Sequence, residues 1–120
     1  MDELRRTPAE IHWEGDSKEV LSGFPKDVKL TFGYSLRLAA KWPAPGVRDT
    51  TDAFYWRGVW ELKESDERSW YRVIYLSRIA DVVCVLHGFE KQSRRTSARD
   101  IVVARNRLKQ VLNRVRGEKK

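Results

Sequence analysis

The sequence predicts one α+β domain, and three observations carry this prediction. Apolar residues recur at helical spacing from Pro25 to about Lys41. Three short runs rich in β-branched and aromatic residues follow between residues 59 and 89, with polar turns between them. A second helical stripe begins near Ser97. A chain of 120 residues is the usual size of one domain, so we expect residues 1–120 to form a single unit.

The first third of the chain is expected to hold a short strand and a helical hairpin. Ile11–Glu14 is a plausible first strand after a loose leader at residues 1–9. Ser17 precedes a short helical stretch, Lys18–Leu21, which Gly23 ends. Pro25 suits the first turn of the next helix, where its missing N–H costs nothing. The buried stripe of that helix is expected to contain Val28, Phe32, Leu36, Ala39 and Ala40.

The central third is expected to form an antiparallel meander of three strands joined by short turns. The predicted strands are Val59–Lys63, Trp70–Ser77 and Val82–Phe89. In the first of them, Trp60 and Leu62 lie opposite Glu61 and Lys63. The third strand is almost wholly apolar, which indicates a central strand covered on both faces.

A basic amphipathic helix is expected to follow. Thr96 or Ser97 can cap it, and Asp100 lies three residues after Ser97, which is capping-box spacing. Residues 116–120 are expected to be a loose tail. The predicted order is therefore β-α-α-β-β-β-α. The apolar stripe of the helix consists of Ile101, Ala104, Leu108, Val111, Leu112 and Val115.

Composition and charge narrow the classes of function. The net charge of +7 suits a nucleic acid or an acidic protein partner, although a basic bias can also serve solubility alone. Residues 68–120 carry fourteen Lys and Arg against four Asp and Glu, so the basic surface belongs to the C-terminal half. No apolar run reaches the ~18 residues of a membrane helix. We expect a cytoplasmic protein that has no membrane partner.

The sequence has few of the cysteine and histidine residues that a disulfide or a metal site requires. Cys84 is the single cysteine, which excludes an internal disulfide and a cysteine-cluster zinc site. His12 and His87 are the only histidines. We therefore expect no metal and no cofactor.

Four segments, in order and at proper spacing, resemble the phage-derived, HigB-like branch of the RelE/ParE toxin superfamily. The helical segment Phe24–Ala40 is the first, and Gly58–Leu62 resembles the second-strand motif GVWEL of that branch. Tyr71–Tyr75 resembles its third-strand motif YRVLY, and Leu86–Thr96 resembles its segment LHAFxKKxxKT. The resemblance covers roughly residues 11–112. It implies a RelE-like α+β fold with a small, mostly antiparallel sheet, an N-terminal helical hairpin and a C-terminal helix.

The resemblance also implies a toxin that pairs with an antitoxin, commonly one of the helix-turn-helix type. Many relatives of the RelE type are mRNA endoribonucleases that cut on the ribosome without a metal ion. Operator DNA is then a partner only indirectly, through the antitoxin. Toxins of the ParE type share the fold and poison DNA gyrase without a nuclease site, so fold does not decide activity. A degenerate corepressor that only binds the antitoxin is a third possibility.

Arg72 and Lys91 are the first candidates for catalysis. Cleavage through the ribose 2′-OH needs a base, an acid and positive charge facing the phosphorane. Arg72 matches the third-strand arginine of the family and can grip a phosphate, or it can simply pair with a carboxylate such as Glu61. Lys91 matches the basic position after the fourth strand. Neighbouring cations would lower its pKa and make it a usable base, whereas its plain interpretation is an exposed lysine at a strand end.

Glu61 and Lys63 fall where nucleases of the RelE type carry two basic residues on the second strand. Lys63 keeps the charge. Glu61 departs from that pattern, and it can act as a base or orient Arg72. The tyrosine that those nucleases use near the C-terminus has no counterpart, since no tyrosine follows Tyr75.

The remaining candidates are less specific. His87 titrates near neutrality and is a catalytic candidate, although a hydrogen-bonded core histidine is the commoner outcome in so apolar a strand. His12 is expected to pack beside Trp13.

Arg57, Arg94 and Arg95 are candidates for RNA binding, and the alternative for the last two is a solvated basic turn. Tyr55 and Trp56 can stack on a base or pack locally, Cys84 is expected to be a small buried residue, and Trp60 and Trp70 are expected to form core or groove walls.

Overall fold

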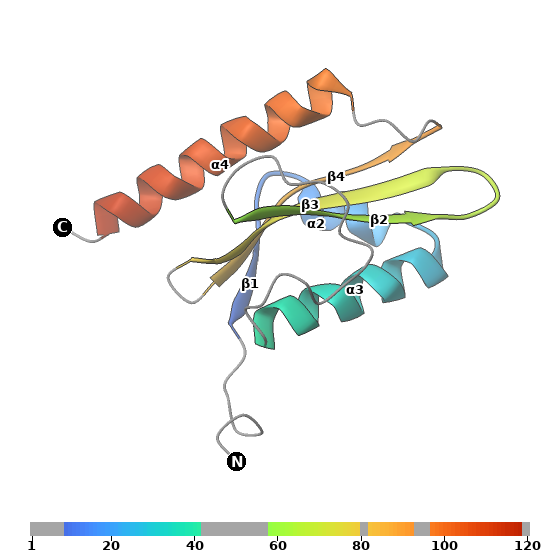
Figure 1. Ribbon diagram of the computed structural model, residues 1–120, viewed down its shortest axis with the longest axis horizontal. Helices are drawn as coiled ribbons and strands as arrows, with labels where there is room; N and C mark the ends of the chain where they lie inside the picture. Colours follow the sequence, from blue (N-terminus) through green and yellow to red (C-terminus); the bar gives the residue numbers. More distant parts are fainter. Residues whose placement is uncertain (1–8, 42–57, 80–81, 93–96, 119–120) are drawn as a thin grey trace, which may run out of the picture.

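The computed structural model describes residues 9–41, 58–79, 82–92 and 97–118, which form four strands and three helices in the predicted order (Figure 1). The predicted RNA-binding residues Arg57, Arg94 and Arg95, and the aromatic candidates Tyr55 and Trp56, lie outside the described residues. The elements are β1 (Glu10–Trp13), α2 (Ser17–Ser22), α3 (Lys26–Lys41), β2 (Val59–Ser65), β3 (Trp70–Ile79), β4 (Val82–Lys91) and α4 (Ala98–Glu118).

The four strands form one sheet in the order β1-β4-β3-β2. β2, β3 and β4 are antiparallel neighbours, as the short turns predicted, and β1 pairs in parallel with the first half of β4. The apolar sequence of β4 is explained by its position, because it lies between two strands and both of its faces are covered. The predicted α+β fold is confirmed.

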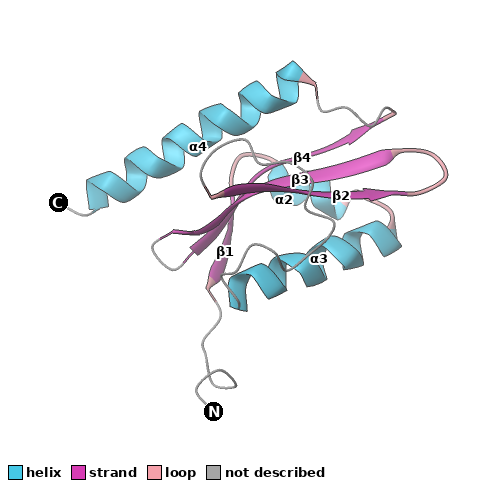
Figure 2. Ribbon diagram, viewed as in Figure 1, coloured by secondary structure: helices cyan, strands magenta, loops and turns pink. Residues whose placement is uncertain are grey.

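The helices cover opposite faces of the sheet, as Figure 2 shows, with α3 on one side and α4 on the other. On the α3 side, Phe24 packs between Phe32 and Tyr71, with ring centroids 6.1 and 5.1 Å away. On the α4 side, the predicted helical stripe supplies Ala104, Leu108 and Val111 to a second apolar cluster. The sheet therefore separates two cores, and each helical stripe found in the sequence fills one of them.

Several predicted boundaries move by a few residues. The start of α2 differs from the prediction, because Asp16 is the N-cap and Ser17 is the first helical residue, whereas Gly23 is the C-cap as predicted. Ser17 is fully buried, and its hydroxyl donates to the Val85 carbonyl at 3.1 Å, so it ties α2 to β4 instead of capping the helix. Ala9 is buried and donates to Ala40, although the sequence placed it in a loose leader. α4 continues to Glu118, into the expected tail.

His12 does not pack beside Trp13 as expected. Its ring is about half exposed and bonds the Glu10 carboxylate at 3.1 Å. The two residues lie two apart on the same strand, so they share a face of β1. No described helix is long and apolar enough to cross a membrane.

Phe32 and Tyr34 provide a test of the α3-side core. Phe32 is 1% exposed and Tyr34 is 59% exposed, although both lie on α3. We predict that Phe32→Ala lowers the free energy of unfolding by about 3–5 kcal/mol, because it removes a buried ring and leaves a cavity. Tyr34→Ala should change it by less than about 0.5 kcal/mol. Urea unfolding measures both values, and equal effects would contradict the placement of α3.

Candidate functional site

Most of the candidate side chains lie on the α4-side face of the sheet. Residues that face each other across an antiparallel ladder project to the same side. Lys63 pairs with Arg72, and Arg72 pairs with Phe89 on the next strand. Trp70 pairs with Lys91 one row further along. We call Glu61, Lys63, Trp70, Arg72, His87 and Lys91 the candidate site.

An irregularity in β4 brings His87 and Lys91 to this face. Tyr75 pairs with Val85 while Ile74 pairs with His87, so Leu86 is an extra residue in the strand. Such a β-bulge breaks the alternation of side chains. Leu86 lies in the α4-side cluster, and His87 bonds an α4 residue, so two consecutive side chains point the same way. The bulge thereby puts His87, Phe89 and Lys91 on the same face as Arg72.

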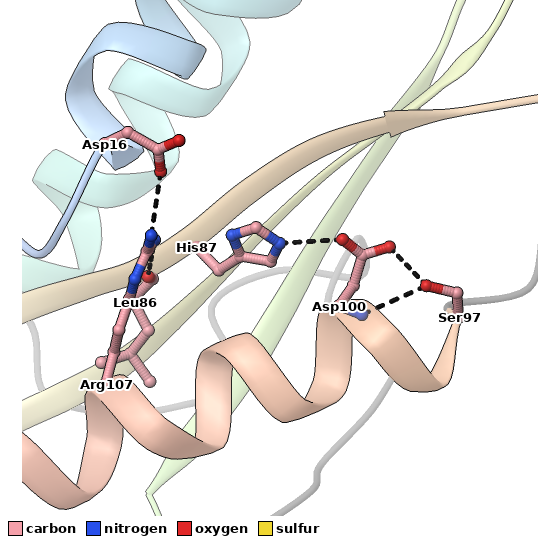
Figure 3. Close-up of polar contacts among 6 residues, drawn as sticks. All are labelled: Asp16, Leu86, His87, Ser97, Asp100 and Arg107. Carbon is pink, nitrogen blue, oxygen red and sulfur yellow. Dashed lines mark hydrogen bonds and ion pairs between the residues drawn. The ribbon is translucent and has the colours of Figure 1, made fainter.

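Arg107 from α4 supports the bulge. Its Nη1 donates to the Leu86 carbonyl at 2.9 Å, and its Nη2 lies 3.1 Å from the Asp16 carboxylate (Figure 3). Gly15 lies against the same guanidinium with φ of +55°, and a Cβ there would clash with it. A residue with a side chain at position 15 would therefore be strained and would push Arg107 away.

Arg72 and Glu61 form a buried ion pair. Arg72 Nη1 lies 3.3 Å from Glu61 Oε2, and both residues are 1% exposed. The structure therefore shows the alternative in which Arg72 pairs with Glu61. The two charges offset each other, so the positive charge nearer the surface of the candidate site belongs to Lys63 and Lys91, which are half-buried.

Trp70 lies beside two of the cations. The Lys63 Nζ is 5.9 Å and the Arg72 guanidinium carbon 5.7 Å from the centre of its ring. At these distances the face of the ring attracts a cation. Trp70, which the sequence placed in a core or groove wall, therefore holds Lys63 and Arg72 at the site. Trp60 packs against the α3-side core.

His87 is linked to the start of α4 through Asp100 and Ser97, as Figure 3 shows. His87 Nε2 lies 2.9 Å from Asp100 Oδ1, and the Ser97 hydroxyl donates to Asp100 Oδ2 at 2.7 Å. The Asp100 amide donates to the same hydroxyl, so Ser97 caps the helix as predicted. Asp100 does not complete the capping box with its carboxylate, because that carboxylate bonds the Ser97 hydroxyl and His87.

The environment of Asp100 favours its charged form. Burial alone would raise the pKa of Asp100, but the hydrogen bonds from Ser97 and His87 outweigh it. The positive charge of Lys91, and that of His87 in its protonated form, acts in the same direction, and the pKa of Asp100 lies below the ordinary value of 3.8. Cys84 is different, because burial raises the pKa of its thiol to about 11. It is a buried residue, as expected, and a poor nucleophile at neutral pH.

The sequence did not identify Ser97, Asp100 and Arg107 as part of this region. The signal for Ser97 and Asp100 was the capping-box spacing, which was interpreted only as a helix start. Arg107 looked like one of several basic residues that flank the stripe of α4. Among the described residues, no group of three or more His, Cys, Asp or Glu side chains is placed to hold a metal ion.

Comparisons with known proteins identify the family. Residues 19–109 match the family model described as phage derived protein Gp49-like (DUF891), so the chain belongs to this family. The resemblance to the phage-derived branch of the RelE/ParE superfamily is thereby confirmed. A comparison with curated proteins gave no significant match.

Two solved structures of the E. coli toxin RelE are similar to the chain. A double arginine-to-alanine mutant in the free state has a TM-score of 0.57 at 13% identity, over 84% of this chain and 98% of that one. The isolated RelE toxin has a TM-score of 0.49 at 13% identity, over 81% of this chain and 97% of that one. The first likeness shows that this chain has the RelE fold.

The Arg72–Glu61 pair gives the first prediction from the site. Arg72→Ala should lower the free energy of unfolding by about 3–5 kcal/mol, because it leaves the Glu61 carboxylate buried without its countercharge. The double variant Arg72→Met/Glu61→Leu should recover most of this loss, because an apolar pair of similar size leaves no buried charge without a countercharge. Urea unfolding of the three proteins provides the measurement. If the Arg72→Ala protein were as stable as the wild type, Arg72 would not be required to stabilise the buried Glu61 carboxylate.

Asp100 gives a pH-dependent prediction. Because its pKa is lowered in the folded protein, its contribution to stability is present above pH 3.8 and is lost as the pH falls through the lower, folded value. Asp100→Asn should therefore be less stable than the wild type at pH 7, and the difference should shrink in acid. Urea midpoints between pH 7 and pH 3 measure it. Glu67→Gln, in the exposed β2–β3 turn, is the control and should show no such trend.

Proposed function

We propose that this chain is the toxin of a toxin–antitoxin pair and that it cleaves mRNA on the ribosome. The proposal rests on the family, on the shared fold of the E. coli toxin RelE and on the candidate site. The observation that carries it is the placement of Lys63, Arg72 and Lys91 on one face of three adjacent strands. A patch of this kind suits an RNA phosphate.

In the proposed reaction, the RNA supplies its own nucleophile. The ribose 2′ oxygen attacks the adjacent phosphorus and gives up its proton to a base. The bond from phosphorus to the 5′ oxygen breaks, and an acid protonates the leaving oxygen. The products are a 2′,3′-cyclic phosphate and a 5′ hydroxyl. This route uses proton transfer and charge stabilisation, and it needs no metal or cofactor.

We assign separate roles to the candidate residues. Lys91 and Lys63 are half-buried, so they are placed to contact the phosphate and to exchange protons. Arg72 is covered by its surroundings, and in this proposal its guanidinium contacts the phosphate only when the site opens. Glu61 is then a positioning residue that orients Arg72. His87 is a further proton carrier, and Asp100 orients it. Arg57, Arg94 and Arg95 are proposed to hold flanking phosphates.

The proposed partners follow from the same assignment. The antitoxin is expected to be of the helix-turn-helix type, and operator DNA is reached only through it. The basic character of the C-terminal half suits both the ribosome and an acidic antitoxin segment. The site of action is the cytoplasm.

Induction of the chain without an antitoxin tests this function. We predict growth arrest, with new transcript 5′ ends inside translated reading frames. Lys91→Ala should slow cleavage by about 10²-fold or more, because it removes a proton-transfer group without disturbing the Arg72–Glu61 pair. Lys18→Ala is the matched control, since Lys18 is an exposed lysine on α2, away from the candidate site.

The other outcomes separate the alternatives. Arrest with intact transcripts would contradict the nuclease and favour a toxin of the gyrase-poisoning kind. No arrest would favour a degenerate module that binds only the antitoxin. Full toxicity in a folded Lys91→Ala protein would contradict the role that is proposed for Lys91.

A further inference from the structure

A cleft of about 570 Å³ lies next to the candidate site, between the second half of β4 and the first half of α4. β1 pairs with β4 only as far as Val85, so β1 does not cover the edge of β4 beyond this point. The cleft has the size of a small-molecule site. His87 and Lys91 belong both to its wall and to the candidate site, so the two are continuous.

Two hydrogen-bonded groups hold the walls in place. On one side, Arg107 is bound by the Leu86 carbonyl and by Asp16. On the other side, Asp100 is bound by His87 and by Ser97. Figure 3 shows both groups, with the imidazole between them. Walls fixed in this way are largely formed before a ligand arrives, which lowers the entropy cost of binding.

His87 provides the observation that points to a ligand. It is 9% exposed, and its Nδ1 is buried with no hydrogen-bond partner among the described residues. A carboxylate only accepts, so Nε2 carries the hydrogen toward Asp100, and Nδ1 of the neutral ring is an acceptor. In Figure 3 this nitrogen faces the side on which Arg107 and Asp16 lie. A buried acceptor of this kind is satisfied when a ligand supplies an N–H or O–H group.

The charges of the cleft suit a ligand with both a phosphate and donor groups. Lys91 and Arg99 line it and form no ion pair with any other described residue, so they are available to a phosphate. Asp16, Glu90 and Asp100 also line it, and their carboxylates accept from amino groups.

We infer that this cleft binds one ribonucleotide of the RNA, next to the nucleotide whose phosphate lies at the candidate site. Arg99 binds its phosphate, Lys91 lies between the cleft and the phosphate at the candidate site, and His87 Nδ1 accepts from its base or ribose. The inference rests on the proposed RNA cleavage and adds a subsite that selects the base beside the cut. Val103 lines the cleft, so its size limits the base that fits.

Two pairs of variants on α4 test the subsite. Val103→Trp fills the cleft, whereas Val102→Trp puts the same ring on a neighbouring position that is 53% exposed. Arg99→Ala removes a cation from the cleft, whereas Arg105→Ala removes an exposed one that does not line it. The second pair needs no change in packing, so it remains informative if Val103→Trp does not fold.

The probes are the adenosine, guanosine, cytidine and uridine 3′-monophosphates, titrated into the isotope-labelled protein and followed by NMR. We expect at least one of them to shift the amide signals of Gly88, Asp100 and Val103 to saturation. Val103→Trp should abolish this binding, and Arg99→Ala should weaken it about tenfold, the scale of one charged hydrogen bond. The Val102→Trp and Arg105→Ala proteins should bind as the wild type does.

Three results would overturn the inference. The first is the absence of saturable binding, or equal binding by the Val102→Trp and Val103→Trp proteins. The second is inorganic phosphate binding as tightly as the nucleotides, which would reduce the cleft to an anion site. The third is a glutamate-rich peptide that binds there more tightly, which would assign the cleft to a protein partner.

The nucleotide titration is independent of the nuclease assay. Transcript cleavage without nucleotide binding in the cleft would keep the proposed function and remove the subsite. Nucleotide binding in a protein that leaves transcripts intact would support the subsite and contradict the proposed nuclease activity.

Discussion

The hydrogen bond from Arg107 to the Leu86 carbonyl supports the arrangement of the whole site. A bulge leaves a backbone group outside the regular ladder, and such a group is costly when it is buried without a partner. Arg107 supplies that partner from α4 and is itself held by Asp16. One guanidinium thus connects the start of α2, the bulge in β4 and the last helix. The orientation of His87 and Lys91 depends on this connection.

The Arg72–Glu61 pair shows a different relation between stability and activity. A buried ion pair seldom adds net stability over an apolar pair of the same size, because desolvation offsets the attraction. Under the proposed function, its presence at the centre of the candidate site is explained by the need for a guanidinium there. Loss of toxicity in an Arg72→Ala protein would not by itself assign a catalytic role, because the same change weakens the fold. Lys91 is a cleaner probe, because it lies at a strand end.

Much of the fold could be predicted from the sequence, whereas the geometry of the site could only partly be predicted. Helical periodicity located α3 and α4, and short turns fixed the β2–β3–β4 meander, because both signals are local. The alternation in β2 correctly placed Glu61 and Lys63 on one face. The bulge was not predicted, since Leu86 lies in a strand that is almost wholly apolar on both faces, so its sequence shows no break in the alternation of side chains. Arg107 was missed because its partners, Leu86 and Asp16, are distant in sequence.

The parallel pairing of β1 with β4 has a consequence for how the protein is made. Glu10 is synthesised 72 residues before its strand partner, Val82. Contacts of such long range form slowly. The intervening chain must lose conformational entropy before these contacts add any stability. Asp100 and Arg107, which orient the site, are synthesised later still. During translation the sheet therefore stays incomplete until β4 has emerged, and the cleft cannot form before α4 docks. A ribosome that makes this protein is therefore exposed to a finished site only after α4 has been synthesised.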